Sequence, residues 1–312
     1  MRIVLAIVQI VLLIAIAPLV RGAIARIKAR IQNRRGASVW RPYADLLKLF
    51  RKEDLAPPTA SAIFRMAPRA VFAATAAAAL FLPILQSSAA FVFAGDFLLF
   101  IYLLAFARFF LSLGAMDGGS AFGGMGASRE ALVSTLAEAP LVLALTAVAI
   151  AARDASLSGM AHWALMQDPT HISAVHALAL GALALVAIAE TGRIPVDNPT
   201  THLELTMIHE AMVLEYSGPS LAWIEWASSI KLALVLSLVI ALFAPWGMTT
   251  SGSLLSALIA LAAFVAKLGV LSVGIAVLES SIAKLRMYLV PDFLGVATAL
   301  AVLAVVFTAV LR

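Results

Sequence analysis

The chain has 312 residues, 63% of them hydrophobic and 12% charged, with a mean hydropathy of +1.02. Soluble domains contain about 45–50% apolar and about 25% charged residues, so this composition indicates an integral membrane protein. The absence of cysteine excludes disulfides, cysteine-ligated iron–sulfur clusters and thiolate zinc sites. The net charge of +5 does not indicate nucleic-acid binding, because 12 of the 22 Lys and Arg residues lie in the one stretch 21–69 directly after the first apolar run, as is typical beside a membrane.

Eight apolar runs predict transmembrane helices, since a span needs about 20 apolar residues, with a range of about 17–25. They cover residues 3–20, 70–86, 97–114, 131–152, 173–190, 220–243, 254–278 and 291–311. The sequence therefore predicts an all-α polytopic membrane protein with amphipathic cytoplasmic-side helices. We expect residues 1–312 to form a single integral membrane domain, whose cytoplasmic-side loops are 21–69, 114–130, 190–219 and 279–290.

Basic residues set the predicted orientation of these spans. The loops after the first, third, fifth and seventh spans contain 16 Lys and Arg residues, whereas the remaining loops and the two ends contain three. Positive residues stay cytoplasmic, so both termini are expected on the periplasmic or outer side of a cell inner membrane. The first apolar run is expected to stay as an anchor, because its positive charge follows the run, unlike that of a signal peptide.

The first cytoplasmic-side loop contains RPYADLLKLFRKED at residues 41–54. Its apolar residues recur at i, i+3, i+4 and i+7, which predicts an amphipathic helix in the membrane interface. One interpretation is an anchor on the membrane surface, and another is a docking surface for a soluble partner.

Ionisable residues also occur inside or at the ends of the predicted spans, namely Arg108, Glu130, Glu138, Glu190, Glu225, Lys231, Lys267 and Glu279. Glu130 and Glu138 are eight residues apart and share a helix face. Charges within a membrane must face the bundle interior, pair or line water. Structural ion pairing and a proton relay are both open for each residue, and the excess of glutamates over buried bases favours a relay for the set.

Two motifs that would indicate other chemistry are incomplete. His209-Glu210 begins a zinc-protease pattern, but Val213 stands where the second histidine is required. The glycine-rich segment 114–130 has neither a complete G-x-G-x-x-G nor a P-loop lysine, so we expect a tight, flexible connection between two spans.

The block at residues 190–218 reads ETGRIPVDNPTTHLELTMIHEAMVLEYSG and holds five carboxylates: Glu190, Asp197, Glu204, Glu210 and Glu215. Residues 201–216 within it are expected to form a helix. Carboxylates gathered where two spans meet are a functional hypothesis by default, because charge near a bilayer is costly.

This block resembles the respiratory complex I subunit 1 family. The resemblance is closer to its hydrogenase branch, the membrane subunit of formate hydrogenlyase and hydrogenase-4-type group 4 membrane-bound NiFe hydrogenases. Residues 32–57, 122–140 and 278–294 resemble further segments of that family. The loop RIPVDNPTTHLELT differs from the quinone-type pattern R-x-P-F-D-L-P-E, which favours a hydrogenase-type partner over quinone binding.

The resemblance implies a non-redox subunit that docks a hydrophilic redox arm and couples electron transfer to proton or sodium translocation. It implies a relay through Glu138, Glu190, Glu204, Glu215 and Glu225. The charge pattern adds the relay candidates Glu130, Asp197, Glu210, Lys231 and Lys267. The docking candidates are Arg34, Arg35, Arg41, Asp45, Lys48, Lys52, Arg193, Lys284 and Arg286. No catalytic residue, metal site or cofactor is expected in this chain.

The implied partners are hydrogenase-like large and small subunits, iron–sulfur subunits and antiporter-like membrane subunits, besides membrane lipid. Iron–sulfur clusters and a NiFe site are expected in those partners. Three alternatives stay open: a quinone-site subunit of an NADH dehydrogenase-like complex, a passive membrane anchor, and an ion-coupled secondary transporter. Inverted repeats and broken midplane helices would support the last, and we detect neither in the sequence.

Overall fold

The computed structural model describes residues 2–167, 173–198, 207–249 and 254–310. This part of the chain contains no β-strand, and one isolated bridge joins Gln86 and Thr249. The helices are α1 (Arg2–Ile31), α2 (Arg41–Phe50), α3 (Ala62–Ala78), η1 (Ala79–Phe81), α4 (Asp96–Asp117), α5 (Ala121–Ala152), α6 (Leu157–Met166), α7 (Ala174–Glu190), α8 (His209–Val213), α9 (Gly218–Phe243), α10 (Leu254–Ser281), η2 (Met287–Leu289) and α11 (Val290–Val310).

The prediction of an all-α polytopic membrane protein is confirmed. Within the described ranges, seven helices are long and apolar enough to cross a membrane, and α7 is a shorter apolar helix of 17 residues. At a rise of about 1.5 Å per residue, α7 is about 26 Å long, slightly less than the bilayer core of about 30 Å.

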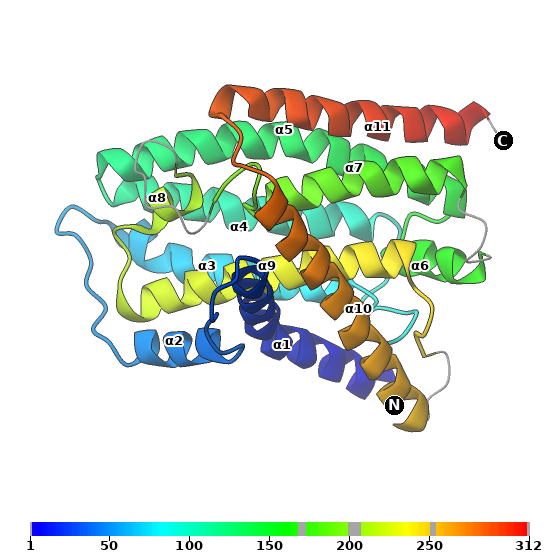
Figure 1. Ribbon diagram of the computed structural model, residues 1–312, viewed down its shortest axis with the longest axis horizontal. Coiled ribbons are helices and arrows are strands. Elements are labelled where there is room, and N and C mark those ends of the chain that lie inside the picture. The colour runs from blue at the N-terminus through cyan, green and yellow to red at the C-terminus, as the bar shows by residue number, and fades with distance from the viewer. Residues whose placement is uncertain (1, 168–172, 199–206, 250–253, 311–312) are drawn as a thin grey trace.

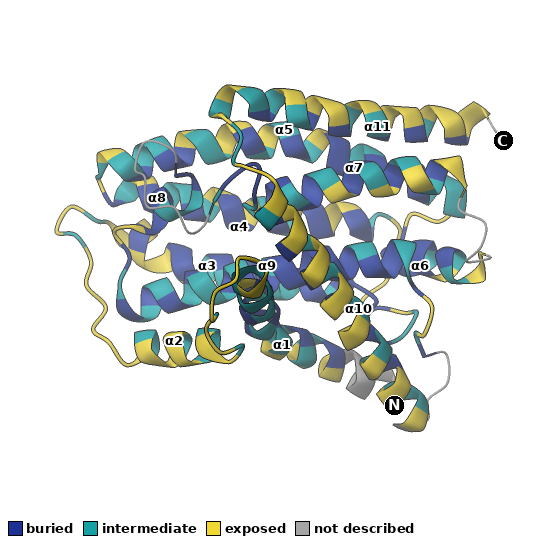
Figure 2. Cartoon of the chain, in the orientation of Figure 1, coloured by how far each residue is buried: buried dark blue, intermediate teal, exposed yellow. Residues whose placement is uncertain are grey.

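Helix α9 is the central element of the bundle. In its most apolar 18-residue stretch, 72% of the residues are buried, against 22% in that of α10 and 28% in that of α11. Figure 1 shows α10 crossing the other long helices at a steep angle, and Figure 2 shows the exposed residues of α10 and α11 on the outer side. The loops that follow α1, α4, α7 and α10 lie toward one end of the bundle, and both termini lie toward the other (Figure 1).

Serine side chains define where four helices begin. Ser61, Ser120, Ser156 and Ser173 precede α3, α5, α6 and α7, and each hydroxyl accepts a hydrogen bond from a backbone N–H in the first turn. These bonds satisfy amide donors that have no partner within the helix.

The second predicted span is displaced along the sequence. Helix α3 begins at Ala62 and η1 ends at Phe81, whereas the sequence predicts a helix over residues 70–86. Arg65 and Arg69 therefore lie on the helix and are exposed there, not in the preceding loop. The predicted end at residue 86 is wrong, because Pro83 cannot continue a helix and disfavours helical backbone in the residue before it.

The glycine-rich connection is much shorter than predicted. Only residues 118–120 separate α4 from α5, and the following glycines belong to α5. They permit close helix contacts: a Cβ at Gly123 would lie 2.3 Å from the Ala115 carbonyl oxygen, and one at Gly126 would lie 3.0 Å from the Ala211 Cβ.

Two further helices differ from the prediction. The helix expected over 201–216 is observed only as α8, residues 214–216 are not helical, and residues 201–206 lie outside the described part. The short helix α6 is not among the predicted spans, since its ten residues fall below the length of a span. The predicted helix at 41–54 is present as α2 and ends at Phe50.

Candidate functional site

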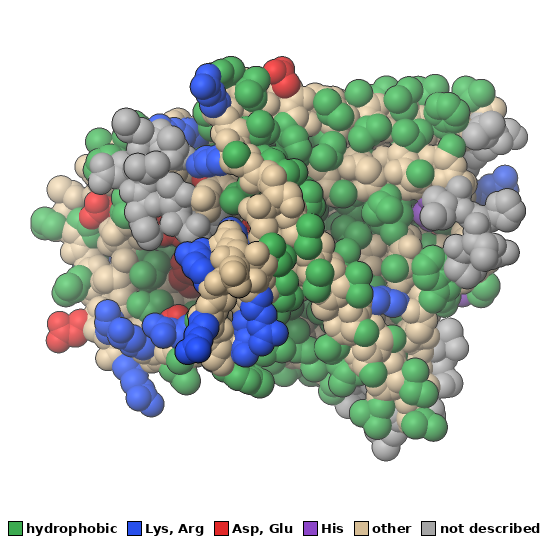
Figure 3. Space-filling model, in the orientation of Figure 1, with side chains coloured by type: hydrophobic (Ala, Val, Ile, Leu, Met, Phe, Trp, Pro, Cys, Tyr) green, Lys and Arg blue, Asp and Glu red, His purple; other side chains and the backbone are tan. Residues whose placement is uncertain are grey.

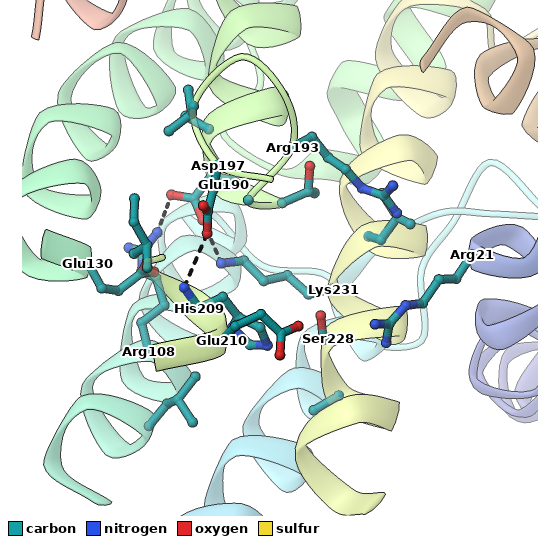
Figure 4. Close-up of a pocket in the computed structure, with 18 of the residues that line it drawn as sticks. Arg21, Arg108, Glu130, Glu190, Arg193, Asp197, His209, Glu210, Ser228 and Lys231 are labelled. Atoms are coloured by element: carbon teal, nitrogen blue, oxygen red, sulfur yellow. Dashed lines mark hydrogen bonds and ion pairs between the residues drawn. The ribbon is translucent and has the colours of Figure 1, made fainter. Parts of the chain in front are cut away.

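A cavity of about 190 Å³ lies between α1, α3, α4, α5, α7, α8, α9 and the end of α10. Figure 4 shows charged side chains from several of these helices pointing toward it. Its ionisable lining residues are Arg21, Lys28, Arg108, Glu130, Glu190, Arg193, Asp197, His209, Glu210, Lys231 and Glu279. It therefore contains five of the predicted relay candidates: Glu130, Glu190, Asp197, Glu210 and Lys231.

Arg108 of α4 joins two glutamates from different helices. One guanidinium nitrogen donates to Glu138 Oε1 of α5 at 2.6 Å, and the other donates to Glu190 at the end of α7. Lys231 Nζ of α9 lies 3.1 Å from the second oxygen of Glu190. The Arg108 and Glu190 side chains are only 8% and 2% exposed. Buried charges persist when they are paired in this way.

A second pair of cations surrounds Glu279 at the end of α10. Its two carboxylate oxygens accept from Lys28 at 3.1 Å and from Arg193 at 3.0 Å, and its side chain is 2% exposed. Burial lowers the pKa of the Arg193 guanidinium, and the charge of Glu279 opposes that change. An arginine stays protonated in such a site.

Asp197 connects three segments at the edge of the cavity. Oδ1 accepts from Lys284 Nζ at 2.7 Å and from the Asn198 N–H at 2.8 Å, while Oδ2 accepts from the His209 N–H at 3.2 Å. The Leu285 N–H also donates to the Pro195 carbonyl at 2.8 Å. The loop after α10 is thereby held against the segment after α7 and the start of α8.

The other relay candidates occupy different places. Glu225 of α9 pairs with Arg21 of α1, next to the cavity. Glu215 is exposed and does not line the cavity. Lys267 binds the carbonyls of Ala244, at 2.6 Å, and of Trp246 beyond the far end of α9, where a cation satisfies carbonyls at a helix C-terminus. Glu204 lies outside the described residues.

The docking candidates divide into two groups. The side chains before and on α2 are exposed: Arg34, Arg35, Arg41, Asp45, Lys48 and Lys52. Arg41 pairs with Asp45 at 2.8 Å. Arg193 and Lys284 instead point inward to Glu279 and Asp197, whereas Arg286 is exposed and donates to the Tyr288 hydroxyl at 3.0 Å. Figure 3 shows Lys and Arg side chains gathered around the end of the bundle that carries α2.

Several lining residues are absent from the predicted site. Arg108 and Glu279 are recognisable in the sequence as ionisable residues of spans, but Arg21 and Lys28 fall in a predicted loop because the first span is expected to end near residue 20. The observed α1 continues to Ile31 and brings both cations to the cavity. No group of three potential metal ligands occurs among the residues that the structure describes.

Comparison with known proteins places these features in a wider group. Residues 3–309 match the NADH dehydrogenase family. The chain is 33% identical over 305 residues to hydrogenase-4 component C of Escherichia coli, covering 98% of this chain and 95% of that protein. It is also 33% identical over 288 residues to formate hydrogenlyase subunit 4 of Escherichia coli, covering 91% of each.

A solved structure shares the fold. A chain of the membrane-bound sulfane sulfur reductase (MBS), an archaeal respiratory membrane complex, superposes with a TM-score of 0.86 at 21% identity. The match covers 99% of this chain and 100% of that one.

Proposed function

This chain belongs to the NADH dehydrogenase family, in its subunit 1 type, and from that premise we propose that it is the coupling subunit of a hydrogenase-4 or formate hydrogenlyase-like membrane complex. In this role it docks a hydrophilic redox arm and passes its redox changes to buried carboxylates that move protons or sodium ions. It resides in the cytoplasmic membrane with its termini on the outer side.

The observation that carries this proposal is the group of paired charges at the cavity. Arg108, Glu190 and Lys231 lie in direct contact, and Glu138 extends the set through the same guanidinium. Interacting ionisable groups respond to each other's charge, so a proton gained by one changes the affinity of its neighbours. Such a set can convert a local change of charge into ion movement.

The exposed basic surface around α2 supports the docking part of the proposal. We define the α2 surface as Arg34, Arg35, Arg41, Lys48, Arg51 and Lys52, which are all exposed. It lies at the same end of the bundle as the loops that close the cavity (Figure 1). A soluble partner bound there would place its redox centres close to Asp197 and Glu279.

The lining of the cavity supports ion transfer. The cavity measures about 190 Å³, and charged side chains from seven helices line it. This space can hold water, for which the charged groups are hydrogen-bond partners.

Isolation of the intact complex from its native membrane tests the proposed assembly. We expect a hydrogenase-like large subunit and iron–sulfur subunits to co-purify with this chain, together with hydrogen evolution. A quinone-reducing assembly without hydrogen activity would contradict the hydrogenase assignment.

Charge changes on the α2 surface test docking separately. Lys48→Glu combined with Arg51→Glu should release the soluble subunits while the membrane subunits stay together. Arg153→Asn is the matched control, because Arg153 is also exposed and basic but follows α5 at the opposite end. Equal retention of the soluble arm in both variants would contradict docking at α2.

A further inference from the structure

Helix α5 leaves one of its faces uncovered. It packs against α4, α7, α8 and α11, and it contributes Glu130 to the cavity. Ser128, Leu132, Thr135 and Ala139 recur at intervals of three or four residues, and all four are exposed. They form a continuous stripe on one side of α5, which we call the outer α5 face.

A carboxylate borders this face inside the candidate membrane span Ala121–Ala152. Glu138 is 37% exposed at its side chain, although Oε1 accepts from Arg108 at 2.6 Å. Helix α5 ends at Ala152, 14 residues later, so Glu138 lies about 21 Å along the axis from that end. Ionisable side chains in spans almost always face the bundle interior, because a charge in hydrocarbon costs several kcal/mol, about 2.5–3.5 on insertion scales.

Helix α10 offers a comparison, because it is the least buried of the candidate spans in the described part of the chain. Its large exposed side chains are all apolar: Leu255, Leu258, Ile259, Val265, Val270, Val273, Val277 and Leu278. Hydrocarbon solvates such a face without any polar requirement. The outer α5 face differs, since it combines Thr135 with a partly exposed carboxylate.

We propose that the outer α5 face is an interface with a transmembrane helix of another membrane subunit, and that this helix places a basic or amide side chain opposite Glu138. Within this chain, Arg108 contacts Glu138 through Oε1, and the Glu138 side chain stays 37% exposed toward this face. A donor on the partner helix would hydrogen-bond the exposed part of this carboxylate, and interhelical hydrogen bonds of this kind hold membrane helices together.

Two other occupants fit the face less well. A lipid headgroup is anionic or zwitterionic and carries phosphate, so it offers a carboxylate less than a basic or amide side chain does. A second copy of this chain related by two-fold symmetry would bring the same patch of both copies together, and this patch has a carboxylate but no basic side chain among its exposed residues. The inference concerns assembly alone and does not depend on ion movement.

This chain has no native cysteine, so an introduced cysteine is its one maleimide-reactive thiol. The same labelling of the unaltered complex gives the background from cysteines of other subunits. Thr135→Cys in the complete complex is labelled with a photoactivatable maleimide in native membranes, and crosslinked peptides are identified by mass spectrometry. Val270→Cys is the control, because Val270 is 71% exposed on the apolar face of α10. Both variants leave the charged residues of the cavity unchanged.

We expect Thr135→Cys to crosslink to a transmembrane segment of a different subunit that carries Lys, Arg, His, Asn or Gln near the crosslink, and Val270→Cys to give mainly lipid adducts. Lipid adducts alone at position 135 would overturn the proposal. A crosslink to a second copy of this chain, or to a wholly apolar helix, would overturn it as well.

Discussion

The Arg108 guanidinium and the Glu190 carboxylate form a buried pair, and each is held by a further partner of opposite charge. Arg108 also binds Glu138, and Lys231 also binds Glu190. Two cations and two carboxylates from four helices thus compensate each other. The removal of any one of them leaves a charge unpaired in an environment where this is costly.

Arg108→Leu should therefore destabilise the complex by about 3–5 kcal/mol, because it leaves two carboxylates without their shared cation. The measurement is thermal unfolding of the purified complex. Adding Glu138→Gln to Arg108→Leu should restore part of the loss, because Glu138 has lost its cation in the single variant whereas Glu190 keeps Lys231. Strictly additive effects of the two changes would show that the pair contributes nothing.

Asp197→Ala should loosen the loop after α10 and the start of α8. The substitution removes the acceptors of Lys284 and of the His209 N–H, each worth about 1–3 kcal/mol when a charged group is involved. Hydrogen exchange should become faster over residues 209–213 and 282–289. Asp292→Ala, an exposed carboxylate of the first turn of α11, is the control and should leave both segments unchanged. Unaltered exchange in the Asp197 variant would contradict the connecting role of Asp197.

Gly114→Ala should destabilise the packing of α4. A Cβ there would lie 2.1 Å from the Tyr216 hydroxyl and 2.8 Å from the Ala67 Cβ. Overpacking of this kind costs about 1–3 kcal/mol. Tyr216→Phe should recover part of the loss, since the hydroxyl is buried and has no hydrogen-bond partner in the described part of the chain. An undiminished loss in the double variant would mean that the hydroxyl is not the obstacle.

Tyr216 should also make stability depend on alkaline pH. Burial raises the pKa of its phenol above the usual value of about 10. The folded state then keeps the proton to higher pH than the unfolded state. The contribution of the protonated Tyr216 phenol to the free energy of unfolding is complete below a pH of about 10 and is lost as the pH rises further. Unfolding measured between pH 9 and pH 11 should show a shallower decline in Tyr216→Phe, and identical slopes would contradict this assignment.

The spans are predictable because they depend on composition and length, and the cavity is predictable only in part. Glu190 and Lys231 can be recognised as charges in or beside apolar runs. The ion pairs that Glu190 forms with Arg108 and Lys231 cannot be recognised, because they depend on how α4, α7 and α9 rotate against each other. Helix rotation is set by packing, which a single sequence does not record.

The end of α1 is wrong because charge is taken to end a span. Arg21 and Lys28 fall in a predicted loop, yet α1 continues through them to Ile31. Ser61, by contrast, is a usable signal for the start of α3, since a serine whose hydroxyl caps the first turn marks a helix N-terminus.

The most direct test of the account is the number of ions moved per electron pair by the purified complex in proteoliposomes. Glu190→Gln and Glu138→Gln should keep electron transfer but reduce translocation at least about tenfold, because an amide cannot take up and release a proton at physiological pH. Asp292→Asn should behave like the unaltered protein. A normal coupling ratio in both glutamate variants would contradict the proposal that these two carboxylates carry ions.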